Sequence, residues 1–184
     1  MEIWINKRLY QYQIDYIMEK QKRKRLLRWL LFAGFVTGSI DALMTIVTNS
    51  KIPPEIIFKY IASGVFGKLA FSPGSEMVIY GVLFHYWIAF AWTVLFFLLY
   101  RQLIHLLRYR ILFIPITGLI IWAVMNLAIV PLSQASASPM HLIGILKNIA
   151  ILIFAFGLPI TVIADRYYSS ASETGQTYEA FKTS

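Results

Sequence analysis

Hydrophobic positions gather into four long runs, separated by short polar segments, at residues 26–48, 76–100, 111–132 and 141–164. The second run, EMVIYGVLFHYWIAFAWTVLFFLLY, holds after its first residue a single charged or imidazole side chain, that of His85. A helix rises about 1.5 Å per residue, so each run is long enough to cross a hydrocarbon core roughly 30 Å thick. The pattern predicts an all-α integral membrane protein, with a four-helix bundle over residues 26–168.

Residues 1–25 precede the first run and are polar and basic. Ile5, Leu9, Tyr12 and Tyr16 recur at helical spacing, which predicts an amphipathic helix lying on the cytoplasmic surface of the membrane. A partly ordered basic tail is the alternative. At the other end of the chain, residues 169–184 are polar and lack periodicity, so we expect a flexible cytoplasmic tail.

Residues 49–75, between the first and second runs, have paired prolines at positions 53 and 54 and end in Ser-Pro-Gly-Ser. Pro54 suits the first turn of a helix. We expect a short interfacial helix on the outer side, with Glu55, Lys59 and Ser63 on its polar side. A re-entrant segment is the alternative, but Lys59 and Lys68 would make deep burial costly.

Composition agrees with a membrane domain and narrows the chemistry. The hydrophobic fraction is 58%, and only 14% of residues are charged, which lies outside the range of an ordinary soluble domain. The chain has no cysteine, so disulfides, thiol nucleophiles and cysteine-based metal centres are excluded. Residues 1–25 are too polar for the apolar part of a cleavable signal peptide, so we expect the first span to act as an uncleaved signal anchor.

Positive charge is concentrated next to the first apolar run. Of 17 Lys and Arg residues, 8 lie in the first 28 positions. A basic cluster beside a membrane helix is attracted to anionic lipid head groups, and no nucleic-acid recognition module accompanies the charge. We therefore expect contact with the lipid bilayer, and not with nucleic acid, from Lys22, Arg23, Lys24, Arg25 and Arg28.

The distribution of Lys and Arg also orients the chain. Residues 1–28, 101–110 and 165–184 contain 8, 3 and 2 of them, against 3 in residues 49–75 and none in residues 133–140. The positive-inside rule then places both termini in the cytoplasm. Five aromatic residues would form a belt at the cytoplasmic interface: Trp29, Tyr100, Tyr109, Tyr167 and Tyr168.

Small and polar residues recur along one face of each of the first three spans, and we expect these faces to point into the bundle. The first span has Gly34 and Gly38, a GxxxG pair that lets another helix approach closely, on the same face as Asp41. Spacings of four define the other two faces, with Gly81, His85 and Ala89 on the second span and Gly118, Trp122 and Asn126 on the third.

Four side chains that are costly to place in hydrocarbon, one from each span, lie at comparable depth: Asp41, His85, Asn126 and Lys147. All lie roughly 9 to 14 Å below the outer surface at the rise of a helix, which predicts a shared polar layer and a binding site there. An unpaired charge is costly in hydrocarbon, so we expect Asp41 to pair with Lys147. The structural alternative is that Lys147 reaches the outer surface and Asn126 bonds a backbone carbonyl.

No catalytic residue, cofactor or metal site is indicated. No three side chains have metal-ligand spacing, and Ser39 lacks the neighbouring base that a nucleophile needs. The stretch SGVFGK at residues 63–68 lacks the spacing of a phosphate-binding loop.

Several stretches resemble a known group of proteins: AGFVTGSIDA, PPEIIFKYIASGVFGKLAF, GVLFHYWIAFAWTVLFFLLY and VMNLAIVPL. They are similar to small four-helix bacterial inner-membrane proteins, and distantly similar to the YagU type associated with acid resistance. The resemblance implies a four-helix membrane domain and a connection with envelope or acid stress. It implies no catalytic residues.

These patterns favour a non-enzymatic inner-membrane protein whose polar layer binds or passes a small solute, an ion or a proton. The alternative is an accessory protein, in which the glycine faces and buried polar groups serve packing against a partner subunit, a second copy of the chain or lipid. Membrane-enzyme chemistry is the third reading, and it lacks an activated nucleophile.

Overall fold

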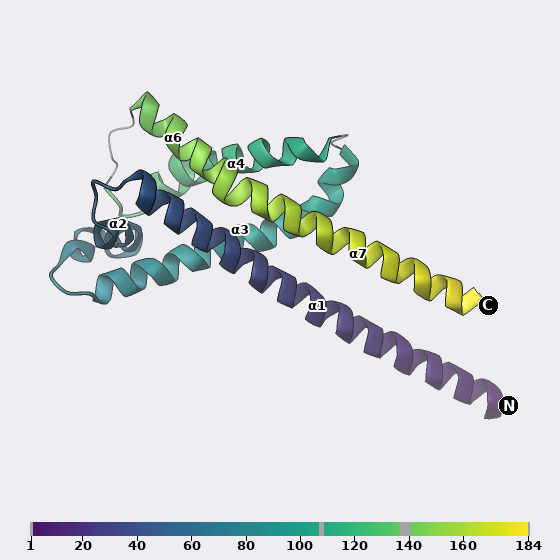
Figure 1. The fold of residues 1–184 in the computed structure, drawn as a ribbon. Helices are drawn as coiled ribbons and strands as arrows, with labels where there is room; N and C mark the ends of the chain where they lie inside the picture. The colour runs from purple at the N-terminus through teal and green to yellow at the C-terminus, as the bar shows by residue number, and fades with distance from the viewer. Residues whose placement is uncertain (1, 107–108, 137–140, 184) are drawn as a thin grey trace.

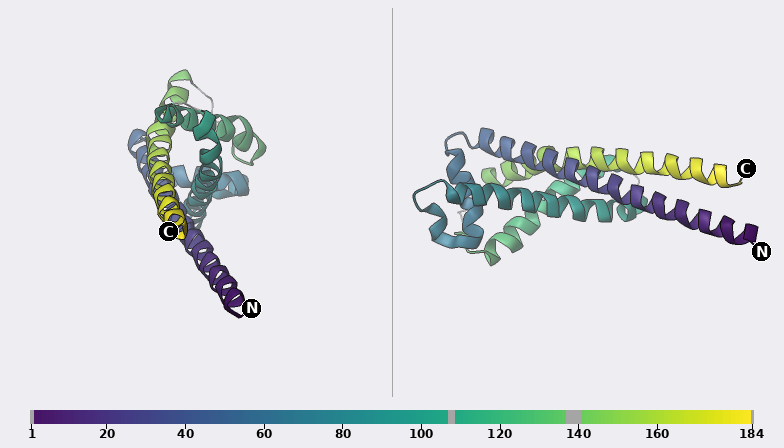
Figure 2. Two further views of the ribbon diagram at one scale, coloured as in Figure 1. Left: turned by 90° about the vertical axis from the view of Figure 1, so that its right-hand side faces the viewer. Right: turned by 90° about the horizontal axis from the view of Figure 1, so that it is seen from below.

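The computed structural model describes residues 2–106, 109–136 and 141–183, with side chains for residues 12–100, 102, 104, 109–136 and 141–170. Four helical stretches are long and apolar enough to cross a membrane: Tyr12–Thr48, Glu76–Tyr100, Arg110–Leu132 and Leu142–Ser170. They alternate in direction, and both termini lie at the same end of the bundle (Figures 1 and 2). The predicted all-helical, four-span architecture is therefore confirmed at the level of helix number, length and composition.

The first and second spans are uninterrupted helices, α1 (Glu2–Thr48) and α3 (Glu76–Leu106). The third consists of η2 (Arg110–Leu112), α4 (Phe113–Val124), the π-turn η3 (Met125–Ile129) and α5 (Val130–Leu132). The fourth consists of α6 (Leu142–Leu152), the π-turn η4 (Ile153–Gly157) and α7 (Leu158–Thr183).

Both π-turns have the same local cause. Each ends two residues before a proline, η3 before Pro131 and η4 before Pro159. Proline has no backbone N–H, and its ring clashes with the carbonyl group of the preceding turn. A wider turn relieves that clash while the helix continues in the same direction.

The segment between the first two spans forms α2 (Pro54–Phe66) and the 3₁₀ helix η1 (Gly67–Phe71), which lie across the end of the bundle remote from the termini (Figure 2). The predicted short helix is present, but its polar side faces the protein. Lys59 and Ser63 are buried, whereas Ile56 and Val65 are exposed. The Lys59 ammonium group donates to the Ser72 carbonyl oxygen at 2.8 Å, which satisfies the buried charge.

Glycines allow the helices to approach closely where the sequence predicted inner faces. A Cβ atom on Gly81 of α3 would lie 2.0 Å from the Phe58 carbonyl oxygen of α2. On the third span, a Cβ atom on Gly118 of α4 would lie 2.7 Å from the backbone nitrogen of Ile153 in η4. The GxxxG pair of α1 packs within this chain, because Gly34 and Gly38 face side chains of α3. These contacts confirm that the small-residue faces point into the bundle.

Both chain ends differ from the sequence-based expectation in being continuous with a span. α1 begins at Glu2, in line with the first span, and α7 continues to Thr183 through the segment assigned to a flexible tail (Figure 1). Residues 2–33 contain no glycine or proline, and residues 165–183 contain one glycine and no proline, so nothing in either segment stops the helix. The position of residues 1–25 on a membrane surface stays a prediction.

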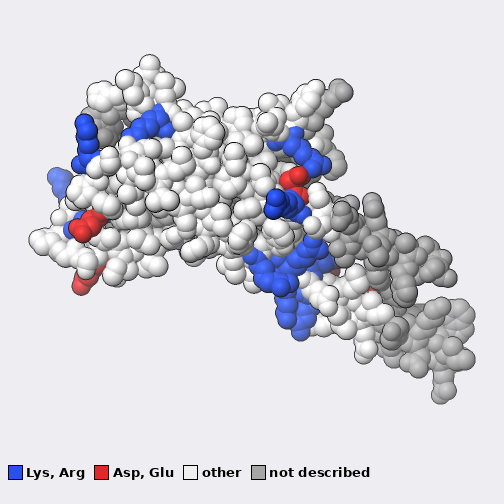
Figure 3. Space-filling model, viewed as in Figure 1, with Lys and Arg blue, Asp and Glu red and all other residues white. Residues whose placement is uncertain are grey.

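Charged side chains gather toward the two ends of the bundle, and the face between them is free of charge (Figure 3). The spans themselves carry many exposed apolar side chains, among them those of Leu43, Leu83 and Leu98. A protein surface of this kind suits hydrocarbon flanked by two polar interfaces.

A candidate ligand cavity between the second and third spans

A cavity of about 560 Å³ lies inside the half of the bundle that α2 covers. Its walls come from α3 on one side and from α4 and η3 on the other, with contributions from α1, α2 and the fourth span. α3 packs against α1, α2 and α7, while α4 packs against α6, η4 and α7. The space between the second and third spans therefore stays open, and its volume lies within the range of small-molecule sites.

Three of the four residues of the predicted polar layer line this cavity. Asp41 comes from α1, His85 from α3 and Asn126 from η3. They belong to three different spans, as the inner faces of those spans predicted. Asn148 of α6 also lines the cavity, whereas its neighbour Lys147 does not.

Lys147 has a different role, and the predicted ion pair between Asp41 and Lys147 is wrong. The Lys147 ammonium group donates to the carbonyl oxygen of Thr48 and, at 2.9 Å, to the side-chain oxygen of Asn49. These two acceptors stand at the C-terminus of α1, where helix carbonyl groups lack intrahelical partners and the helix dipole is negative. Lys147 therefore caps α1 near the end of the bundle, and among the described residues it forms no pair with Asp41.

His85 and Asn126 each use a side-chain donor on a backbone carbonyl group. His85 Nε2 lies 2.8 Å from the Gly38 carbonyl oxygen, and Asn126 Nδ2 donates to the Trp122 carbonyl oxygen at 3.0 Å. A carbonyl oxygen can only accept, so His85 Nε2 carries a proton, and in the neutral imidazole Nδ1 is then an acceptor. In the same way, the side-chain oxygen of Asn126 remains an acceptor.

Asp41 differs from these two residues in having no hydrogen-bond partner. Its carboxyl group makes no hydrogen bond or ion pair with the side chains and backbone that the structure describes. It does interact electrostatically with His85. The carboxyl group lines the cavity, one α-helical turn beyond the Gly38 carbonyl group that His85 contacts. An acidic group that faces an open space within an apolar bundle is a candidate binding group.

Both π-turns contribute to the cavity wall, η3 through Met125, Asn126 and Ile129 and η4 through Phe156. Such turns occur often at functional sites, because the extra residue turns side chains toward a cavity. The hydrophobic pattern gave no sign of either turn. Pro131 and Pro159, each within an apolar run, are the sequence signal that could have found them.

The exposed part of the lining forms the mouth of the cavity. Trp87, Val65 and Ile129 line the cavity and are 76%, 52% and 42% exposed, and the polar lining residues Tyr60 and Asn148 are exposed as well. At the end of the bundle α2 is joined to residues 133–136: the backbone N–H of Gln134 donates to the Gly64 carbonyl oxygen at 3.0 Å, and the Tyr60 hydroxyl group donates to the Ser136 carbonyl oxygen at 3.4 Å.

The opposite half of the bundle is filled by aromatic side chains. Tyr100, Phe113 and Phe97 are almost completely buried, and the Tyr168 hydroxyl group donates to the Phe97 carbonyl oxygen at 2.6 Å. The expectation that Tyr100 belongs to an interfacial belt is therefore wrong. Its ring lies 5.6 Å from that of Tyr168, so the two pack within the bundle, whereas Tyr109 is exposed.

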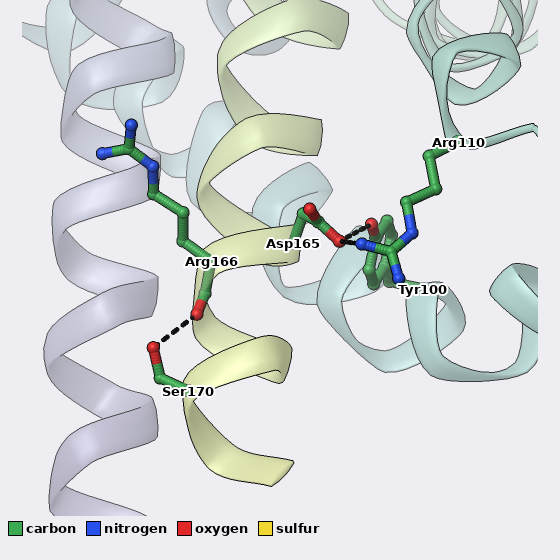
Figure 4. Close-up of polar contacts among 5 residues, drawn as sticks. All are labelled: Tyr100, Arg110, Asp165, Arg166 and Ser170. Carbon is green, nitrogen blue, oxygen red and sulfur yellow. Dashed lines mark hydrogen bonds and ion pairs between the residues drawn. The ribbon is translucent and has the colours of Figure 1, made fainter. Parts of the chain in front are cut away.

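Asp165 completes this packed end (Figure 4). One carboxylate oxygen accepts from Arg110 Nη1 at 2.5 Å and from the Tyr100 hydroxyl group at 3.2 Å. The pair joins the start of the third span to the fourth. On the same helix, the Ser170 hydroxyl group donates to the Arg166 carbonyl oxygen at 2.9 Å.

The basic cluster of α1 stands beside the packed end. Arg23 pairs with Glu19 at 3.3 Å, and the Arg25 guanidinium group lies 5.7 Å from the centre of the Tyr167 ring. Lys22, Lys24 and Arg28 are exposed. Their contact with anionic lipid stays a prediction.

Within the described part of the chain, no group of three His, Cys, Asp or Glu side chains is placed to hold a metal ion. Comparison of the sequence with protein-family models, and of the chain with curated proteins and solved structures, finds no match. The resemblance to small four-helix inner-membrane proteins of the YagU type therefore stays an expectation.

Proposed function

We propose that this chain is a non-enzymatic, multi-pass protein of the bacterial inner membrane that binds a small solute in the cavity between the second and third spans. Four apolar helices and a pocket of about 560 Å³ support a binding role. A connection with envelope or acid stress stays an expectation of the resemblance.

The observation that carries this proposal is the position of Asp41. The carboxyl group lines the cavity and has no hydrogen-bond partner among the described residues. A folded bundle gains nothing from an acidic group in that position, since burying it without a partner costs free energy. A bound solute or water would supply the missing partner.

We propose that both termini lie on the cytoplasmic side of the membrane. Their location at one end of the bundle follows from the even number of spans (Figure 1). Eight Lys and Arg residues lie in the first 28 positions, at that same end. The positive-inside rule makes this the cytoplasmic side and places α2 and the cavity toward the periplasm. The basic cluster of α1 would then contact anionic head groups of the inner leaflet.

A second candidate function is that of an accessory protein whose polar groups serve packing. The bonds of Lys147 and Asn126 favour it, because both side chains are satisfied by backbone carbonyl groups of the bundle itself. On this reading the exposed apolar flank would contact a partner subunit or a second copy of the chain. The open cavity at Asp41 has no role in it.

Thiol labelling separates the two candidates. The chain has no cysteine, so each introduced thiol is the sole reactive group. Thr45→Cys places a thiol in the cavity wall, Thr93→Cys places one at a fully buried position, and Leu43→Cys places one on the exposed apolar surface. The reagent is N-ethylmaleimide, a small permeable maleimide, applied to inner-membrane vesicles.

Because the thiolate is the reactive form, labelling requires both access and water. A hydrated, reachable cavity predicts fast labelling of Thr45→Cys and slow labelling of the other two variants. If folded Thr45→Cys reacts as slowly as Thr93→Cys, the cavity is closed and dry, and the accessory reading replaces the binding role.

A further inference from the structure

We infer that the cavity takes an amphipathic organic cation, a molecule with an apolar body and one positively charged nitrogen or phosphorus centre, which arrives through the bilayer. The inference rests on the proposed binding function and names the chemical class of its ligand. It follows from the lining chemistry and from the direction of the mouth.

Three polar side chains of the cavity present acceptors, whereas the amide group of Asn148 can both donate and accept. Asp41 offers a carboxyl group, which a bound cation would hold in its ionised form. In the neutral imidazole of His85, Nδ1 is an acceptor when Nε2 donates to the Gly38 carbonyl oxygen, and Asn126 offers its side-chain oxygen. Tyr60 also lines the cavity, but its hydroxyl group already donates to the Ser136 carbonyl oxygen. Three convergent acceptors with one negative charge match a positively charged ligand.

The charge balance of the lining points the same way. The described lining residues include one acidic side chain and no lysine or arginine. Lys147, a basic residue on the neighbouring helix, is held by the C-terminus of α1 and does not reach the cavity. An anionic ligand would therefore meet Asp41 with no lysine or arginine beside it, and repulsion would disfavour it relative to a cation.

Aromatic rings supply the rest of the wall. Phe84, Trp92, Trp122 and Phe156 line the cavity from the second, third and fourth spans. Ring faces attract cations, most strongly those of tryptophan, and they also pack against an apolar body. A carboxylate combined with aromatic walls is the combination that recognises bulky organic cations.

The mouth indicates the route. Its exposed apolar side chains are those of Val65, Trp87 and Ile129, beside the polar side chains of Tyr60 and Asn148. The apolar side chains give a lipid-soluble molecule a route that crosses no charged group. An amphipathic cation concentrates in the bilayer and would enter between α3 and η3.

Two probes matched in shape and opposite in charge test the inference: tetraphenylphosphonium, a cation, and tetraphenylborate, an anion. Both partition into bilayers. The readout is the rate at which N-ethylmaleimide labels Thr45→Cys in membrane vesicles, measured with and without each probe. Because the thiol lies in the cavity wall, probe held only by lipid does not protect it.

We expect tetraphenylphosphonium to slow labelling and tetraphenylborate to leave it unchanged. Adding Asp41→Asn, which keeps the shape of the side chain, should weaken protection by the cation about tenfold, the cost of one charge-assisted contact. Glu76→Gln makes the same change at an exposed position outside the cavity and should keep the protection.

The outcomes distinguish this inference from the proposed function. Equal protection by both probes, or protection that survives Asp41→Asn, would show a binding cavity without cation selectivity and overturn the inference alone. Fast labelling that neither probe slows would also overturn it, while the hydrated cavity stands. If the thiol does not react at all in folded protein, the proposed function and the inference both fail.

Discussion

The two halves of the bundle use an aspartate in opposite ways. Asp165, at the end near the termini, accepts from Arg110 and Tyr100 and is backed by buried aromatic rings. Asp41, at the end covered by α2, faces an open cavity and lacks such partners among the described residues. The same residue type therefore serves assembly at one end and remains available at the other. The presence or absence of hydrogen-bond partners, and not the residue type, distinguishes a structural aspartate from a candidate binding group.

The largest expected difference between the halves is the effect of removing an aromatic ring. Phe113 is 1% exposed within the aromatic cluster, so Phe113→Ala should lower the free energy of unfolding by about 3 to 5 kcal/mol. Phe84 fronts the cavity and is half-buried, so Phe84→Ala should lower it by at most about half as much, since fewer packing contacts are lost. Denaturation in mixed detergent micelles measures both values. Equal losses would contradict the contrast between a packed half and an open one.

A smaller effect is expected where α2 seals the cavity half. Gly81→Ala would place a methyl group against the Phe58 backbone, and we expect a loss of about 1 to 3 kcal/mol in unfolding free energy. The matched control is Gly144→Ala in α6, where a Cβ atom would have no neighbour within 4 Å. That change should be neutral or stabilise by up to about 1 kcal/mol through helix propensity. A neutral Gly81→Ala would show that α2 is not packed on α3.

The cap formed by Lys147 should contribute less. Lys147→Met removes the donor to the C-terminus of α1, and we expect a loss of about 1 kcal/mol in unfolding free energy. Lys51→Met, at an exposed position of the same end, is the control and should change little. The contrary result is a Lys147→Met protein that is as stable as the unchanged protein but in which tetraphenylphosphonium protects Thr45→Cys less from labelling. That result would place Lys147 in the cavity.

Much of the bundle could be predicted because hydrophobic length and small-residue spacing act locally. The four spans follow from apolar runs, and Gly38, His85 and Asn126 follow from four-residue periods that fix one inward face. The inward faces and the comparable depth of Asp41, His85 and Asn126 were enough to predict that these three side chains lie in one region of the bundle. Three of the four residues of the predicted polar layer line one cavity, and their role in binding stays a prediction.

What escaped prediction depends on contacts between distant segments. From the sequence, the Lys147 side chain could either pair with Asp41 or reach the outer surface. The nearby C-terminus of α1, which accepts its hydrogen bonds, decides between the two. No partner was predicted for Asp165, although Arg110 binds it across the bundle. Lys59 was placed on a solvent-facing side, but the Ser72 carbonyl group holds it inside. Hydropathy carries no information about such partners.

The most direct test of the contrast is the change in unfolding free energy on neutralising each aspartate in turn. Asp165→Asn removes an ion pair that is partly exposed, and we expect a loss of about 1 kcal/mol. Asp41→Asn removes a carboxyl group without partners, and we expect no loss, or a gain of about 1 kcal/mol, because less polarity is then buried. A loss at Asp165 together with no loss at Asp41 would support an available acid in the cavity. A loss at Asp41 as large as that at Asp165 would mean that Asp41 has a structural partner, and the account of the cavity would be wrong.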